Sequence, residues 1–124
     1  MRETGWLIRL EDMLVCALRI SEYSGSLSKV QFVANRQAID AVLHNLIIIG
    51  EAANRIPDDV KLRLTDVEWQ KIRGMRNRLV HDYFSADLDV VWKTATEDVP
   101  DLVRVLPALI AAEEERQKPV DKSN

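Results

Sequence analysis

The chain has 124 residues and a formal net charge of −3, from 17 Lys and Arg against 20 Asp and Glu. This length predicts one domain, and the charge argues against a uniformly basic nucleic-acid-binding surface. The single cysteine, Cys16, excludes an intrachain disulfide and a cysteine metal cluster. No apolar run approaches the ~20 residues of a membrane span, and no signal-peptide pattern is seen, so we expect a cytoplasmic protein.

Apolar residues at helical spacing predict helices from the N-terminus onward. The first covers about residues 3–23 and ends at the turn 24–26, and its stripe comprises Leu7, Leu10, Leu14 and Ala17, with Met13 and Ile20 beside it. A short helical turn follows around residues 30–32. Asn35 is expected to cap a long helix that reaches about Arg55, with a stripe formed by Ala38, Val42, Ile49 and Ala53.

The second half of the chain also has helical periodicity. Pro57 should stop the preceding helix and open a short one. Thr65 and Glu68 have the spacing of a capping box and predict a helix running to about Val80. Ser85 or Asp87 should cap the last helical region, which Pro100 should kink or split. Its buried stripe continues with Leu102, Val105, Leu106 and Leu109.

The predicted fold is therefore an all-α bundle of about five helices. Residues 1–116 form its helical domain, and the polar residues 117–124 form a C-terminal tail. A helical chain of this size often hides further apolar surface by pairing with a second copy, so a homodimer is expected.

The segment 76–83 contains the residue types that RNA cleavage without a metal needs. Arg76 offers a fixed cationic fork to a phosphate, and His81 can move a proton in either direction near neutral pH. Asn77 lies one helical turn before His81, whereas Arg76 and His81 are about 140° apart on an ideal helix. A helix end near His81 would be needed to bring the two together, and Gly74 would permit close approach of another backbone.

An ordinary structural interpretation stays open beside the catalytic one. In it, the segment is a solvated helix face on which Arg78 and Asp82 form an ion pair. His44 is then a core or interface residue, and Glu51 has a structural ion-pair partner. The only two histidines, His44 and His81, with one cysteine, give a zinc site poor support. The residues Trp6, Trp69 and Trp92 are interpreted as core or dimer contacts rather than base-stacking platforms.

The run Gly-Met-Arg-Asn-Arg-Leu-Val-His-Asp-Tyr-Phe over residues 74–84 resembles the signature of the HEPN domains. It is most similar to the HepT-like RNase toxins of the MNT–HepT toxin–antitoxin systems, which carry Arg-x4-His-x-Tyr. Residues 49–53 and 92–100 also resemble that family, so the resemblance spans nearly the whole chain.

The resemblance implies a metal-independent endoribonuclease toxin of the type VII class, acting as a homodimer on RNA, with transfer RNA one possible substrate. Arg76 would stabilise phosphoryl charge, His81 would act as general acid or base, and Asn77 would orient His81 or bind the phosphate. A nucleotidyltransferase antitoxin of the MNT type would attach AMP to Tyr83 and block RNA.

No cofactor is expected. Lys71, Arg73 and Arg78 form a basic run suited to backbone phosphates. The alternative is a non-catalytic helical subunit that binds or docks a nucleotidyltransferase.

Overall fold

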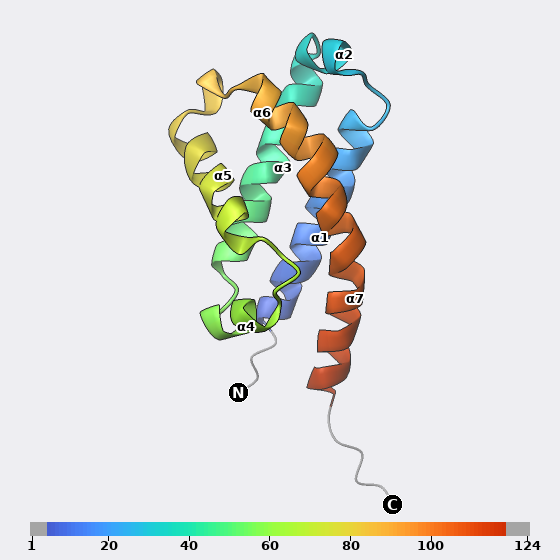
Figure 1. Cartoon of the computed structure of the whole chain (residues 1–124), viewed down its shortest axis with the longest axis vertical. Coiled ribbons are helices and arrows are strands. Elements are labelled where there is room, and N and C mark those ends of the chain that lie inside the picture. Colours follow the sequence, from blue (N-terminus) through green and yellow to red (C-terminus); the bar gives the residue numbers. More distant parts are fainter. Residues whose placement is uncertain (1–4, 119–124) are drawn as a thin grey trace, which may run out of the picture.

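Residues 5–118 are described by a computed structural model, and they form helices and connecting turns without a β-strand (Figure 1). The long helices are α1 (Gly5–Ser24), α3 (Arg36–Asn54), α5 (Trp69–His81) and α7 (Val99–Gln117). The short ones are α2 (Lys29–Val33), α4 (Asp58–Arg63) and α6 (Leu88–Lys93). A 3-10 turn occupies Tyr83–Ser85 and a π-helical turn occupies Thr94–Asp98. The predicted all-α fold is confirmed.

The helices pack in a chain of neighbours in which α1 contacts both α3 and α7, and α3 also contacts α5 (Figure 1). The helix α6, the π-helical turn and α7 run on as one rod beside α1. Of the residues predicted for the first two stripes, most are buried, and only Leu7 and Leu14 are half-buried. Burial of each large apolar side chain contributes roughly 1.5–3 kcal/mol, so these stripes hold α1 and α3 together.

Helix ends follow the sequence signals at three places. The side chain of Asn35 accepts a hydrogen bond from the backbone N–H of Ala38 at 3.0 Å and begins α3. The side chain of Asp87 accepts from the backbone N–H of Asp89 at 2.9 Å and begins α6. Pro57 lies directly before α4, where its fixed φ suits the start of a helix.

The predicted capping box of Thr65 and Glu68 is wrong. Helix α5 begins only at Trp69, and no side chain caps it. Leu64 and Val67 are both buried, and the backbone N–H of Val67 donates to the carbonyl of Leu64 at 3.4 Å. Burial of these two side chains therefore fixes a turn where the capping box would have started a helix.

Pro100 does not split the last helical region, in which α6, the π-helical turn and α7 follow one another without a gap, but the helix type changes just before it. Pro100 lies in the first turn of α7, and the π-helical turn precedes it. Because proline has no N–H, it cannot bond the carbonyl of Thr96, and Val99 donates to Thr94 in the wider π pattern. Helix α7 ends at Gln117, the first residue of the predicted tail, while residues 1–4 and 119–124 lie outside the described part.

Candidate functional site

The candidate site is built on α5. Leu79 is fully buried on this helix, and Ile72 and Met75 are half-buried against the core. The opposite side of the helix is polar, because Arg73, Asn77 and His81 recur at every fourth residue, about 40° apart around the axis. All three of these side chains are exposed, so one turn of α5 after another presents a polar group to solvent.

Gly74 lies beside this exposed stripe. Apart from the adjacent backbone of α5 itself, no heavy atom of residues 5–118 would lie within 4 Å of a Cβ atom placed on Gly74. The backbone contact expected at Gly74 is therefore not made by any described residue of this chain, and a contact with a second copy stays a prediction. Close packing occurs instead at Gly50 on α3, where a Cβ would stand 2.3 Å from the Cβ of Arg76.

Arg76 lies on the side of α5 that faces α3. Its Nε and Nη2 both donate to Oε2 of Glu51, the Nε bond being 2.9 Å long. Its Nη1 donates to the side-chain oxygen of Asn77 at 3.1 Å. The prediction that Glu51 has an ion-pair partner is confirmed, and that partner is the arginine of the motif.

Helix α5 continues without interruption through His81. The backbone N–H of Asp82 still donates to the carbonyl of Arg78 at 2.9 Å. The helix therefore does not loosen before His81, and Arg76 and His81 keep the separation of about 140° around its axis. The expectation that a helix end brings the two side chains together is wrong within one chain.

Tyr83 begins the 3-10 turn that follows α5. Its ring is half-buried against the core, and it meets the ring of Phe84 edge-on with 5.3 Å between centroids. Phe84 itself is 91% exposed. The end of the motif therefore combines a partly sheltered phenol with an unusually exposed aromatic ring.

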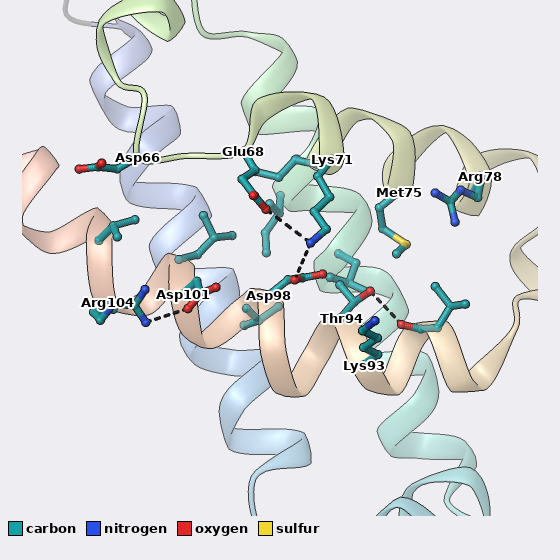
Figure 2. A pocket seen from close by; sticks show the side chains of 17 residues that line it. Asp66, Glu68, Lys71, Met75, Arg78, Lys93, Thr94, Asp98, Asp101 and Arg104 are labelled. Carbon is teal, nitrogen blue, oxygen red and sulfur yellow. Dashed lines mark hydrogen bonds and ion pairs between the residues drawn. The ribbon is translucent and has the colours of Figure 1, made fainter.

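Two residues of the predicted phosphate-binding run, Lys71 and Arg78, line a groove beside α5 (Figure 2). This groove has a volume of about 410 Å³ and lies between α5, α3 and the rod of α6 and α7. Its apolar lining comprises Leu46, Ile49, Ile72, Met75, Val90, Val99, Leu102 and Val105. Arg73 lies about 160° around the axis of α5 from Lys71, so the basic run does not form one continuous surface.

Lys71 is already paired within the groove. Its Nζ lies 3.0 Å from Oδ1 of Asp98 and 3.4 Å from Oε1 of Glu68, as the dashed lines in Figure 2 show. The hydrogen bond to Asp98 is the main reason that the pKa of the Lys71 ammonium is raised. Among the described ion pairs there is none between Arg78 and Asp82, so the expected pairing of these two is not seen.

The other reactive residues lie away from this site or are unsuited to it. His44 is exposed on α3, so it does not lie in the core, and a place at an interface between chains stays a prediction. Cys16 is buried, and burial raises the pKa of its thiol, which keeps it protonated and unreactive. Within residues 5–118, no three His, Cys, Asp or Glu side chains gather as a metal-ligand set would. Over the same residues, no helix combines the length and apolar character that crossing a membrane requires.

Similarity to known proteins covers most of the chain. Residues 13–109 match the family described as Ribonuclease HepT-like. The chain is 37% identical over 93 residues to "Probable ribonuclease HepT" of Thermococcus cleftensis, covering 75% of this chain and 84% of that protein. It is 36% identical over 91 residues to "Putative RNase MJ1380" of Methanocaldococcus jannaschii, covering 73% and 84%. No solved structure shows a significant match.

Proposed function

Because this chain belongs to the HepT-like ribonuclease family, we propose that it is an endoribonuclease that cleaves RNA without a metal ion. The observation that carries the proposal is the arrangement of α5. This helix carries Arg76, whose guanidinium bonds Glu51 of α3, and presents Asn77 and His81 to solvent. These are the groups that phosphodiester cleavage by a ribose hydroxyl requires.

In the proposed reaction, the ribose 2′-oxygen attacks the adjacent phosphorus and the bond to the 5′-oxygen breaks. His81 accepts the proton of the 2′-hydroxyl or gives a proton to the departing 5′-oxygen. Arg76 donates hydrogen bonds to the phosphoryl oxygens as negative charge grows on them. Asn77 binds the phosphate or orients His81, and Arg73 and Arg78 bind flanking phosphates.

The proposed active form is a homodimer. Within one chain, Arg76 and His81 lie on different sides of α5, so a second α5 facing the first would complete the set of groups around one phosphate. Three features around the motif support this: Gly74 leaves open space, Val80 is 50% exposed and Phe84 is 91% exposed.

The proposed control is that of a type VII toxin–antitoxin system. A nucleotidyltransferase antitoxin of the MNT type would attach AMP to the hydroxyl of Tyr83. The support is that Tyr83 directly follows α5, two residues after His81. An added phosphate there would carry negative charge to the motif and compete with RNA for its arginines.

A non-catalytic docking subunit for a nucleotidyltransferase is the second candidate. The observation that favours it is that Arg76 and Lys71 already have carboxylate partners, which reduces the free positive charge at the motif. Such ion pairs are compatible with a docking helix, but a docking helix has no need of an exposed histidine.

Cleavage of bulk RNA in the presence of EDTA distinguishes the two functions. We expect the wild-type chain to cleave, and Arg76→Ala and His81→Ala to lose most activity with unchanged helical circular dichroism. His44→Ala is the matched control, because it removes the other histidine from an exposed helical position. Activity that EDTA abolishes and magnesium restores would overturn the metal-free reaction. RNA that stays uncleaved with the wild type and with all three variants would favour the docking function.

The control by AMP attachment is tested on the two tyrosines of the chain, Tyr23 and Tyr83. After incubation with a nucleotidyltransferase of the MNT type and ATP, intact-mass spectrometry should show added AMP on the wild type and on Tyr23→Phe. Tyr83→Phe should cleave RNA yet gain no AMP and keep its activity. Modification and silencing of Tyr83→Phe would place the switch on another residue.

A further inference from the structure

The side chain of Glu51, on the last turns of α3, makes the closest polar contact to the motif arginine. It is half-exposed, at 45%, whereas the Arg76 side chain is 26% exposed. A carboxylate with this much access to water does not need a partner in order to be tolerated. The stability of the fold therefore does not by itself explain why Glu51 is paired with Arg76.

We propose that Glu51 is a positioning residue for catalysis, which holds the Arg76 guanidinium in the orientation that receives the scissile phosphate. This inference rests on the proposed ribonuclease function. It assigns Glu51 no proton transfer and no contact with RNA.

The hydrogen bonds that the Arg76 guanidinium makes with described residues leave two of its N–H groups unused. A guanidinium carries five N–H groups. Nε and Nη2 each use one on Glu51, and Nη1 uses one on Asn77. One N–H on Nη1 and one on Nη2 remain, and both can donate to the oxygens of a phosphate. Glu51 thus holds the guanidinium through Nε and Nη2, and N–H groups on Nη1 and Nη2 are left for an anion.

The aliphatic stem of Arg76 is fixed at the same time. A Cβ on Gly50 would lie 2.3 Å from the Cβ and 2.4 Å from the Cγ of Arg76, so the stem rests directly on the α3 backbone. Since Glu51 follows Gly50 in the chain, one turn of α3 holds both the stem and the head of the arginine. A group held in this way needs little reorganisation when the phosphate gains charge.

Charge neutralisation predicts the opposite outcome for the same pair. If Glu51 merely quenched Arg76, loss of the carboxylate would strengthen RNA binding and raise the cleavage rate. If Glu51 positions Arg76, its loss lowers the rate of the chemical step, because the guanidinium then samples several rotamers.

The test measures kcat and KM for cleavage of an RNA oligonucleotide by full-length Glu51→Ala and Glu51→Gln. We expect Glu51→Ala to lower kcat by roughly 10- to 100-fold, with KM changed by less than about threefold. Glu51→Gln, whose amide oxygen still accepts from Arg76, should recover part of that loss. The matched control is Glu114→Ala, which removes an exposed carboxylate on α7 and should keep wild-type values.

A double variant separates this proposal from a general effect on folding. In an Arg76→Ala background, Glu51→Ala should cause no further fall in kcat, because the group that it positions is gone. Unchanged or raised kcat in both Glu51 variants would overturn the positioning role. If Glu51→Ala does not fold, a kcat of Glu51→Gln below that of the wild type supports the positioning role, and an unchanged or raised kcat overturns it. Full activity of Arg76→Ala would instead overturn the proposed function.

Discussion

The position and orientation of the Arg76 side chain on α5 are set by residues of another helix, α3. Its position in the motif is a matter of sequence, but its stem is seated on Gly50 and its guanidinium is bonded to Glu51. Both of these residues lie 25 or more positions away along the chain. The chemistry of Arg76 therefore depends on the contact between α3 and α5.

Replacing Gly50 by alanine should disturb this contact. The new Cβ would lie 2.3 Å from the Cβ of Arg76, a distance that forces α5 or the arginine stem to move. We expect Gly50→Ala to lower the free energy of unfolding by about 1–3 kcal/mol, as overpacking does, and to reduce RNA cleavage. Urea denaturation and the cleavage assay would measure the two effects.

The control for this substitution is Gly5→Ala. Gly5 is exposed at the start of α1, and among residues 5–118 no heavy atom beyond its own helical turn lies within 4 Å of a Cβ built there. It should change the free energy of unfolding by less than about 0.5 kcal/mol. Equal stability of both variants would show that α3 and α5 are not packed as closely as described.

At the scale of elements, α4 and α7 are joined by a pair of side chains distant in sequence. The carboxylate of Glu113 is only 4% exposed and accepts from Nη1 and Nη2 of Arg63 at 2.9 and 3.3 Å. Arg116 lies farther from the same carboxylate, at 3.7 Å. This bidentate pair ties the connection between α3 and α5 to the C-terminal half of α7.

Removal of Arg63 should leave the buried carboxylate of Glu113 poorly compensated. Arg63→Ala is expected to lower the free energy of unfolding by about 2–3 kcal/mol, less than for a fully buried pair because Arg63 is 36% exposed. Chemical denaturation at neutral pH would measure the loss. Arg104→Ala removes a pair with Asp101 in which both side chains are more than 60% exposed, and it should cost less than about 1 kcal/mol. A similar loss in both variants would contradict a special role for Arg63.

For the whole molecule, the decisive feature is the polar face of α5 with open space at Gly74. We expect light scattering to report about twice the mass of the chain at micromolar concentration. Gly74→Leu should fold, because no side chain of the described residues occupies that space, yet it should dissociate the dimer and reduce RNA cleavage.

Gly5→Leu serves as the control for the dimer experiment, since Gly5 is also open within the chain. It should leave the mass and the cleavage rate unchanged. A monomeric wild type that cleaves RNA would contradict the dimeric arrangement, and so would a Gly74→Leu variant that stays dimeric and fully active.

Local signals in the sequence determined the all-α class, the cap at Asn35, the cap at either Ser85 or Asp87, an irregularity near Pro100 and the apolar stripes of α1 and α3. Each depends on residues within one or two turns of one another, so helical periodicity and capping chemistry suffice to find them. The motif with Arg76 and His81 was also visible, because its residues lie together on α5.

Only the tertiary structure decided the partners of these residues. The capping box at Thr65 failed because burial of Val67 and Leu64 outweighed a local hydrogen bond. Gly50 rather than Gly74 marks the close approach, and Glu51 bonds Arg76, because the packing angle of α3 against α5 brings those positions together. Sequence spacing cannot reveal such contacts, since they depend on which faces of two helices pack against each other.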